Sequence, residues 1–221
     1  MADNRSYTVF SKGPEMVAGL MAIPQEMRAE GMKPCWSGYV ASDNVDADAA
    51  RVVTAGGSIK RAPNDIPNVG RFAVVADPGG AVFLLFKPNS TEEPKPVAPM
   101  TPGHIGWHEL YADDPDRELA FYSKLFGWTK DRAVDMGPMG TYQTFATGAE
   151  PCGGMMKACA QMPAPMWNYY IAVESVAKAA NRAQKRGAEI LNGPMEVPGG
   201  AWIVQARDPQ GAAFAVVSAQ K

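Results

Sequence analysis

Two histidines four residues apart, the second followed directly by a glutamate, are the residues best placed in this sequence to do chemistry. His104 and His108 share one face if their segment is a strand, because side chains alternate along a strand. Such a pair is typical of a metal site or of a general base. The favoured alternative is structural, with one histidine in the turn before the strand and the other on its helix-facing side. Glu109 is the second candidate for a general base, and it suits a ligand contact or a structural ion pair equally well.

Aromatic side chains at strand spacing surround these candidates. Trp107, Tyr142 and Tyr170 could flank a flat organic ligand, because small-molecule clefts consist of apolar and aromatic walls with a few polar groups. Packing in a core is the favoured alternative for such aromatics. The three cysteines, Cys35, Cys152 and Cys159, form no Cys-x-x-Cys motif and have no base beside them in the sequence. Only the fold could therefore bring a base close to one of them.

Composition and missing motifs exclude several other classes of function. The sequence has no Gly-x-Ser-x-Gly elbow, no Walker loop and no Gly-x-Gly-x-x-Gly after a strand. A net charge of −2 without a run of Lys or Arg argues against nucleic acid as a partner. No apolar stretch approaches the ~18 residues of a membrane span, and the first residues do not resemble a signal peptide. We therefore expect a cytoplasmic protein that binds neither membrane nor nucleic acid.

An internal repeat predicts the elements that must position these residues. Residues 36–83 match residues 167–214 at a constant offset of 131 without a gap. Residues 7–21 match residues 142–156 at an offset of 135, whereas the segment from about His104 to Thr141 has no counterpart upstream. Repeated segments of this kind indicate the architecture before any single motif does.

Each passage of the repeat reads as a strand, a helix and three further strands. Helix starts are indicated by Asn44, by Asp114 with a proline after it, and by Ser175, while Gly127 suits a helix end. The proline-rich segment 89–102 reads as an extended linker. We therefore expect an N-terminal domain at 1–88, whose first unit lacks its strand and helix, and a complete C-terminal domain at 103–221.

This pattern resembles the vicinal oxygen chelate superfamily, which includes glyoxalase I, bleomycin resistance proteins and extradiol dioxygenases. The segment from Asp113 to Trp128 and the Asp-Pro-x-Gly turns that begin at Asp77 and Asp208 carry the resemblance. The resemblance implies an α+β fold, in which strand-helix-three-strand (βαβββ) units pair into cupped half-barrel sheets with the helices outside. In that superfamily the cup binds the metal ion and the ligand.

The positions that hold metal in the superfamily carry other residue types here. In the C-terminal domain they fall on Trp107, Met155 or Met156, Asn168 and Ala215, and in the N-terminal domain near Leu20 or Met21, on Ser37 and on Leu84. None of these is a histidine or a carboxylate, whereas a catalytic divalent ion usually has about three protein ligands. We therefore expect neither a metal ion nor another cofactor, and we expect a small organic ligand in the C-terminal cup. The residues predicted to contact it are Trp107, Glu109, Tyr142, Met156, Asn168 and Tyr170.

Two other functions and three explanations of the incomplete first unit stay open. One alternative is a metal-dependent lyase, isomerase or dioxygenase of the same superfamily, with His108 and Glu109 as its first candidate residues. The other is a non-catalytic scaffold whose cup is filled by its own side chains. The incomplete unit is explained by a gene start assigned too late, by truncation, or by a homodimer in which a second chain covers the gap.

Overall fold

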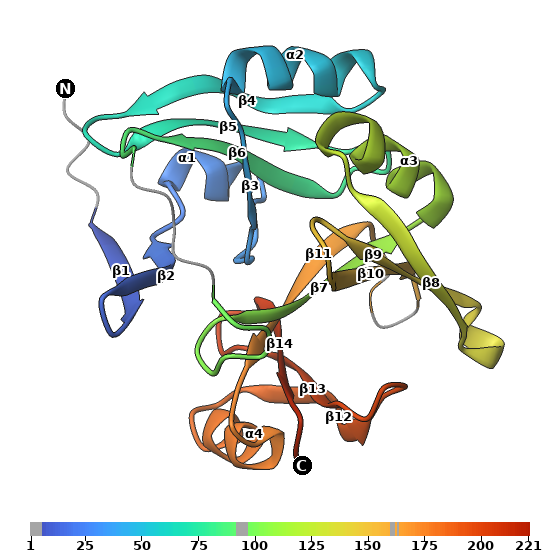
Figure 1. Ribbon diagram of the computed structural model, residues 1–221. Helices are drawn as coiled ribbons and strands as arrows, with labels where there is room; N and C mark the ends of the chain where they lie inside the picture. The colour runs from blue at the N-terminus through green and yellow to red at the C-terminus, as the bar shows by residue number, and fades with distance from the viewer. Residues whose placement is uncertain (1–5, 92–96, 160–161, 163) are drawn as a thin grey trace. The chain divides into compact units, whose positions relative to one another are not determined.

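The structure is a computed structural model that describes residues 6–91, 97–159, 162 and 164–221 (Figure 1). The chain divides into two compact units, and each is described by itself. The first unit comprises Met1–Trp36, Ala98–Gly106 and Tyr170–Lys221, and the second comprises Ser37–Val97 and Trp107–Tyr169. Strands β7 and β11 each contribute residues to both units.

A βαβββ motif occurs three times within the residues that the structure describes. Its first strand pairs in parallel with its last, and antiparallel pairing then continues through the third strand to the second. The first copy consists of β3 (Tyr39–Ala41), α2 (Val45–Thr54), β4 (Ser58–Ile66), β5 (Gly70–Ala76) and β6 (Val82–Pro88). The second consists of β7 (Ile105–Ala112), α3 (Pro115–Phe126), β8 (Thr129–Asp135), β9 (Thr141–Ala146) and β10 (Pro151–Lys157), with a short 3-10 helix, η1 (Gly137–Met139), before β9. The third consists of β11 (Met166–Ala172), α4 (Val176–Gln184), β12 (Glu189–Glu196), β13 (Trp202–Arg207) and β14 (Ala213–Ser218).

The helices begin at the capping residues that the sequence indicated. Asn44, Asp114 and Ser175 accept backbone N–H groups at the starts of α2, α3 and α4. Gly127 ends α3 with φ at 73°, a left-handed conformation that glycine adopts without a steric penalty. Local chemistry therefore explains where these helices begin and where α3 ends.

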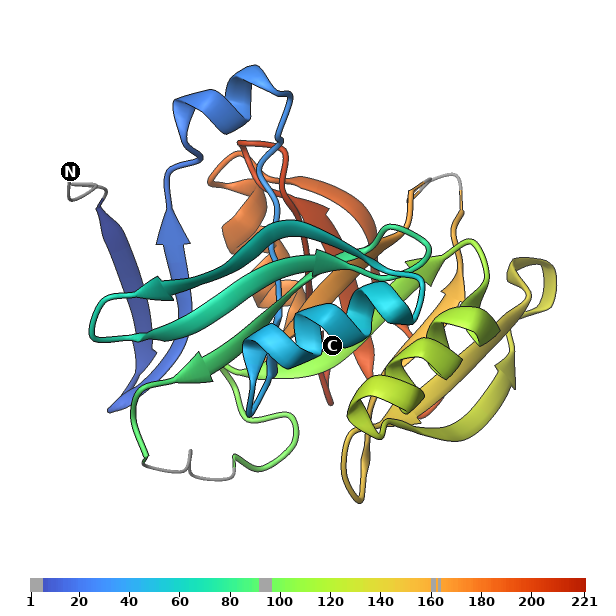
Figure 2. The same cartoon turned by 90° about the horizontal axis from the view of Figure 1, so that it is seen from above.

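In the second unit, α2 and α3 lie side by side on the outer faces of the two sheets (Figures 1 and 2). The Arg51 side chain of α2 donates to the Leu125 carbonyl at 2.8 Å, at the C-terminal end of α3. Beneath α3 the Trp128 ring stacks between Tyr122 and Phe145, with centroid distances of 4.6 and 4.9 Å. This aromatic stack fixes α3 against β9 and therefore holds the sheet that carries the candidate residues.

The first unit contains the third motif and the N-terminal segment. Helix α4 buries Val176 and Ala180 against Val204 of β13 and Val216 of β14. The N-terminal segment forms a hairpin of β1 (Tyr7–Lys12) and β2 (Glu15–Met21), followed by the short helix α1 (Gln25–Ala29). In the described part of the chain this hairpin is a two-stranded sheet of its own. The hairpin matches β9 and β10 in the repeat, as the 135-residue offset predicted.

The predicted α+β class and the repeated βαβββ motif are confirmed. Strands β4 and β8 and helix α1 were not predicted as separate elements, although the pattern of three strands after each helix requires β4 and β8. The two compact units combine segments from both halves of the sequence. The division into domains 1–88 and 103–221 stays a prediction, and residues 92–96 of the predicted linker lie outside the described residues.

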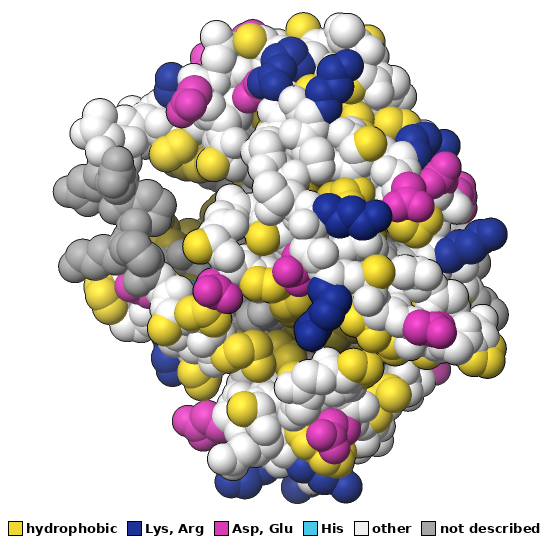
Figure 3. Space-filling model, turned by 45° about the vertical axis from the view of Figure 1, so that its right-hand side comes forward, with side chains coloured by type: hydrophobic (Ala, Val, Ile, Leu, Met, Phe, Trp, Pro, Cys, Tyr) yellow, Lys and Arg dark blue, Asp and Glu magenta, His cyan; other side chains and the backbone are white. Residues whose placement is uncertain are grey.

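No helix in the described part of the chain is both long and apolar enough to cross a membrane. On the face drawn in Figure 3, basic and acidic side chains are interspersed and do not gather into one patch of a single sign.

Candidate functional site

Strand β7 separates its candidate residues onto two faces. Leu110 points into the core beneath α3, so His108 lies on this helix-facing side, while Trp107 and Glu109 lie on the opposite one. Glu109 is only 6% exposed. The predicted placement of Trp107 and Glu109 on one face is therefore confirmed, and we call this face of the β7–β10–β9–β8 sheet the inner face.

Tyr142 of β9 joins Trp107 and Glu109 into one hydrogen-bonded chain on the inner face. The Trp107 indole Nε1 donates to the Tyr142 hydroxyl at 2.7 Å, and that hydroxyl donates to the Glu109 carboxylate at 3.1 Å. Burial raises the pKa of Tyr142 well above its ordinary value, and the nearby Glu109 carboxylate raises it further. The phenol therefore stays protonated and keeps its donor directed at Glu109.

A glycine makes this chain geometrically feasible. Strand β10 lies between β9 and β7, and Gly154 pairs directly with Glu109. A Cβ atom on Gly154 would lie 2.1 Å from the Tyr142 ring, so the ring crosses β10 only because this residue has no side chain. The same arrangement recurs in the N-terminal hairpin, where a Cβ on Gly19 would lie 1.8 Å from the Tyr7 hydroxyl. Tyrosine over glycine is thus a packing feature of the repeat, whereas the bonds to Trp107 and Glu109 belong to the second copy.

Asn168 of β11 adds a buried amide on the same side. The neighbouring Trp167 points toward α3, where its indole donates to the Tyr122 hydroxyl at 2.9 Å, so alternation places Asn168 on the inner face. Its side chain is 1% exposed, and neither its amide oxygen nor its amide nitrogen has a hydrogen-bond partner among the described residues. A buried carboxamide without partners is costly, and in a native protein it indicates water or a ligand.

The other two predicted contact residues lie in different settings. Met156 of β10 is buried and shares the inner face with Gly154, two residues before it. Tyr170 is placed in the first unit, where its hydroxyl accepts from the Gln205 side chain at 2.7 Å. The second unit therefore brings together Trp107, Glu109, Tyr142, Met156 and Asn168 on one side of its sheet.

The two histidines do not act as a pair in this structure. His104 lies in the first unit, just before β7, with its Nε2 3.0 Å from a Glu15 carboxylate oxygen. His108 lies in the second unit with its Nδ1 3.0 Å from the Cys152 carbonyl oxygen. These placements match the structural alternative, with one histidine before the strand and one on its helix-facing side. His108 and Glu109 also point to opposite faces, so β7 does not direct them toward a common ion.

The inner face does not fit a divalent metal ion of the kind that glyoxalases and dioxygenases hold. Its polar groups include one carboxylate from Glu109, one indole from Trp107, the phenols of Tyr142 and Tyr111, and one carboxamide from Asn168. Within the described ranges, no three His, Cys, Asp or Glu side chains gather into a candidate metal site. Catalytic sites for such ions usually present about three imidazole or carboxylate ligands. We therefore derive no step through a metal ion.

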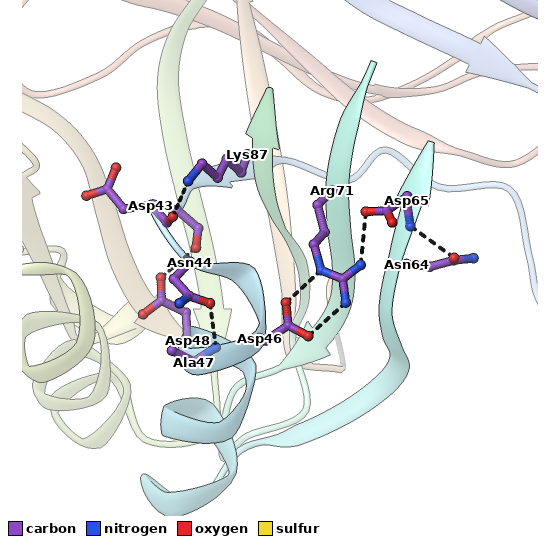
Figure 4. Close-up of polar contacts among 10 residues, drawn as sticks. Asp43, Asn44, Asp46, Ala47, Asp48, Asn64, Asp65, Arg71 and Lys87 are labelled. Carbon is purple, nitrogen blue, oxygen red and sulfur yellow. Dashed lines mark hydrogen bonds and ion pairs between the residues drawn. The ribbon is translucent and has the colours of Figure 1, made fainter. Parts of the chain in front are cut away.

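Two charged residues away from the inner face, Arg71 and Asp208, have structural roles. Arg71 of β5 makes a bidentate contact with Asp46 at 2.6 and 2.7 Å and also bonds Asp65, as Figure 4 shows. Asp208 holds its turn by accepting from the backbone of Gln210 and Ala212. These contacts confirm that Arg71 is paired and that Asp208 forms a turn.

Sequence reasoning identified Asp77 as a turn former and missed its second role. Its Oδ1 accepts from the Ala81 backbone at 2.8 Å, as a turn residue does, but its Oδ2 accepts from Tyr122 of α3 at 3.1 Å. Burial, followed by the nearby charge of Glu118, raises the pKa of Asp77 to about 6. Glu118 is fully buried, and its Oε2 has no partner in the described chain. The available signal was the four-residue spacing of Glu118 and Tyr122, which places both on the inward stripe of α3.

An open hollow of 420 Å³ lies on the helix-facing side of the second unit, away from the inner face. It is bordered by the start of α3, by η1 and by Gln143, which points away from the side of Tyr142. Because Gln143 already donates to two backbone carbonyls, this hollow offers no orphaned polar group there.

Comparison with known proteins places the fold in a family. Residues 102–216 match the Glyoxalase/Bleomycin resistance protein/Dioxygenase superfamily, which is the vicinal oxygen chelate superfamily expected from the sequence. The chain belongs to this superfamily.

Among its relatives, the protein named "Putative glyoxylase CFP32" from Mycobacterium tuberculosis is 31% identical over 96% of this chain and 79% of its own length. The "Anthracycline biosynthesis protein DnrV" of Streptomyces peucetius is 33% identical over 85% of this chain, and the match spans 66% of DnrV.

Solved structures of the superfamily show the same fold at lower identity. An Mn(II)-bound glyoxalase from Novosphingobium aromaticivorans aligns with a TM-score of 0.59 and 18% identity, over 83% of this chain and 62% of that one. The 2,2',3-trihydroxybiphenyl 1,2-dioxygenase of Sphingomonas wittichii aligns with a TM-score of 0.59 and 14% identity, over 84% of this chain and 71% of that one.

Proposed function

We propose that the inner face binds a small organic ligand through side-chain hydrogen bonds and aromatic contacts, without a protein-held metal ion. The observation that carries the proposal is the buried carboxamide of Asn168, whose amide oxygen and nitrogen both lack a hydrogen-bond partner among the described residues. It falls at a position where the superfamily resemblance implies a metal ligand. A neutral carboxamide there suits recognition of an organic group better than coordination of a divalent ion.

The geometry indicates what the ligand must offer. Asn168 presents an acceptor and a donor side by side, so a planar group with an adjacent donor and acceptor satisfies both in one contact. The Trp107 and Tyr142 rings are already fixed by their mutual hydrogen bond, and pre-ordered aromatic walls lower the entropy lost on binding. Glu109 supplies a carboxylate that can accept a ligand hydroxyl in addition to the Tyr142 hydroxyl.

The names of two relatives guide the choice of probes. DnrV is named for anthracycline biosynthesis, and an anthracycline is a flat polycyclic aromatic compound that carries hydroxyl and carbonyl groups side by side. CFP32 is named as a glyoxylase, which makes a small dicarbonyl the second probe. Aromatic residues and an amide on the inner face favour the first of these ligands over the second.

The Asn168→Leu substitution tests the proposal directly, because it removes both amide groups while keeping a similar volume. We expect the unfolding free energy to rise by about 1–2 kcal/mol, since a buried group without partners is removed. We expect the same variant to lose binding of an anthracycline, measured by titration calorimetry and tryptophan fluorescence in the presence of EDTA. Asn181→Leu, on the exposed surface of α4, is the matched control and should keep binding.

The outcomes of this experiment distinguish metal-free ligand binding from a metal-dependent enzyme and from a non-catalytic scaffold. Binding that survives EDTA and disappears in Asn168→Leu supports the metal-free site. Binding that requires an added divalent ion supports the metal-dependent enzyme instead. If neither the anthracycline nor methylglyoxal raises the melting temperature of the wild-type protein, the scaffold alternative is favoured. A true ligand at one hundred times its dissociation constant should add about 2.7 kcal/mol of stability.

A further inference from the structure

Asn168 is held in place by its two neighbours on β11, which are anchored on the opposite face of the strand. The Trp167 indole donates to the Tyr122 hydroxyl at 2.9 Å, and the Tyr169 hydroxyl accepts from the Gly38 backbone at 2.7 Å. Because both neighbours are bonded on the helix-facing side, alternation fixes the direction in which the Asn168 side chain leaves the strand. The carboxamide is therefore presented from a regular strand with a supported backbone, as a preorganised recognition group requires.

The neighbouring donors of the inner face are already committed. Strand β11 pairs with β7, so Asn168 lies on the strand next to Trp107 and Glu109. The Trp107 indole donates to the Tyr142 hydroxyl, and that hydroxyl donates to the Glu109 carboxylate. The Asn168 side chain is 1% exposed, and neither of its polar atoms has a hydrogen-bond partner among the described residues. Asn168 therefore supplies one N–H donor and one carbonyl acceptor to a ligand on this face.

This pattern of one donor beside one acceptor excludes several kinds of ligand edge. A carboxylate presents two acceptors and an amidinium presents two donors, so each leaves one amide atom of Asn168 facing a group of its own kind. An anion also meets the buried Glu109 carboxylate on the same face, and like charges repel strongly away from water. In a hydroxyl beside a ring carbonyl, the hydrogen is already held inside the ligand by that carbonyl. Such an edge makes only one of the two hydrogen bonds that Asn168 offers.

We propose that the inner face recognises the cyclic secondary amide of a flat heterocycle, which is a lactam of the pyridone or quinolone kind. The N–H and C=O groups of such a ring lie side by side, so they form two hydrogen bonds with the Asn168 carboxamide at once. Exchange of the amide oxygen and nitrogen by rotation keeps the two edges complementary, because the ligand turns over with them. The flat ring suits the aromatic side chains of Trp107 and Tyr142. This ligand class rests on the proposed function, since it specifies the ligand of the same metal-free site.

The first test uses the wild-type protein and pairs of ligands that differ by one methyl group. 2-Quinolone is the probe, and N-methyl-2-quinolone, which keeps the ring and the carbonyl but has no N–H, is its matched control. We expect titration calorimetry in EDTA to show 2-quinolone binding at least about tenfold more tightly, because the methyl group leaves the Asn168 carbonyl without a donor. 2-Pyridone and N-methyl-2-pyridone form a second pair without the fused ring.

The Asn168→Asp substitution reverses the pattern of the recognition group. An ionised aspartate presents two acceptors, which suit the two donors of protonated 2-aminoquinoline. We expect this variant to lose 2-quinolone and to bind 2-aminoquinoline at neutral pH, whereas the wild type prefers 2-quinolone. Asn181→Asp makes the same change on the exposed surface of α4 and should keep the wild-type preference. Thermal melting checks that each variant folds, and the comparison of methylated ligands in the wild type does not depend on a variant.

The outcomes separate this proposal from the proposed function on which it rests. Tighter binding of the N–H lactams, lost in Asn168→Asp, supports a cyclic amide as the ligand. Equal affinity of the N–H and N-methyl forms overturns it, as does a preference for N–H that persists in folded Asn168→Asp. If an anthracycline binds in EDTA and no lactam does, the cyclic amide is overturned and metal-free binding stands. If no probe binds, or if binding requires an added divalent ion, both proposals fail.

Discussion

At the scale of single residues, position 154 decides whether the inner face exists in its present form. A side chain there would occupy the path of the Tyr142 ring, and Tyr142 is the only link between Trp107 and Glu109 in the described hydrogen-bonded chain. The backbone of Gly154 is not in the left-handed region, so alanine is conformationally allowed and its cost is steric. The polar network thus depends on a glycine that contributes no side-chain group to it.

Gly154→Ala should destabilise the protein by about 1–3 kcal/mol, because its Cβ displaces the Tyr142 ring from a packed position. Urea denaturation measures the change, and tryptophan fluorescence reports the altered surroundings of Trp107. Gly148→Ala is the control, since a Cβ at Gly148 meets no atom within 4 Å.

A double-mutant cycle sharpens this prediction. Tyr142→Ala removes the ring that the new methyl group strikes, so the double variant should be less destabilised than the sum of the two single changes. Strict additivity would show that the methyl group at position 154 acts through something other than Tyr142.

At the scale of elements, the contact between the Asp77 turn and helix α3 brings together two buried carboxylates of the second unit. Asp77 follows β5, while Glu118 and Tyr122 belong to α3. Gly79 allows this approach, because a Cβ at that position would lie 2.9 Å from a Glu118 carboxylate oxygen. Arg117 compensates one oxygen of Glu118 at 2.8 Å. The carboxylates of Asp77 and Glu118 therefore lie close together in a buried contact, with Arg117 as the paired cation.

This contact predicts a pH dependence of stability. The pKa of Asp77 is raised from 3.8 to about 6 by burial and then by Glu118, so the folded protein binds the Asp77 proton more tightly than the unfolded chain does. The contribution of this group to stability is complete below pH 3.8 and is lost as the pH rises through about 6. A shift of about two units corresponds to ~3 kcal/mol.

Asp77→Asn should therefore raise the unfolding free energy at pH 8 by up to ~3 kcal/mol, with a smaller gain at pH 4.5. Asparagine keeps the acceptor for the Ala81 backbone and carries no charge. Asp208→Asn alters the same position of the repeated turn and keeps its acceptors for Gln210 and Ala212, so it should change stability little. Denaturant titrations at the two pH values measure these changes in unfolding free energy. An Asp77→Asn variant that is less stable than Asp208→Asn at pH 8 would contradict the argument.

The elements show why some features could be predicted from the sequence and others could not. Caps at Asn44, Asp114 and Ser175 act within a few residues, so the sequence revealed them. Strand β8 carries Lys130, Asp131 and Arg132 and has mostly exposed residues, so it lacks the apolar alternation that identifies a strand. β8 forms because it pairs with β9 in the folded protein, and that pairing leaves no pattern in the sequence of β8 itself.

The same distinction holds for the candidate residues. The placement of Trp107 and Glu109 on one face follows from strand alternation and could be predicted. The approach of His108 to Cys152 requires the parallel pairing of β7 with β10, and the approach of Asp77 to Tyr122 requires the docking of a turn on α3. Both pairs are separated by more than forty positions in the sequence. Spacing along the chain carries no signal for contacts of that range.

At the scale of the whole molecule, the repeat units differ in how completely they are supported. The second motif places its hairpin, β9 and β10, between β8 and β7. The matching hairpin of β1 and β2 keeps the packing of tyrosine over glycine, but it forms a two-stranded sheet in the described chain. It exposes large apolar side chains, which are Tyr7, Val9, Phe10, Met16, Leu20 and Met21. Isolated two-stranded hairpins are marginally stable in water.

Hydrogen exchange should reveal this difference directly. Backbone amides of β1 and β2 should exchange much faster than those of β7 and β10, because the hairpin has exposed edges and contains no fully buried residue. Mass spectrometry of peptides from both regions, at low micromolar protein concentration, measures the contrast. The β9–β10 hairpin is the matched control within the same chain. Equal protection of the two hairpins at every concentration would contradict the prediction.

A homodimer, which the sequence analysis left open as one of three explanations of the incomplete first unit, would add a concentration dependence to the same measurement. If a second copy covers the hairpin, its amides become protected as the protein concentration rises, since association is a bimolecular equilibrium. The Leu20→Lys substitution should abolish this increase in amide protection, because a charge buried in an apolar contact is costly. The exchange rates of the β7 and β10 amides should stay unchanged. If the protection of the hairpin amides does not depend on protein concentration, a second copy of the chain does not cover this surface. The exposed side chains of β1 and β2 would then need a different explanation.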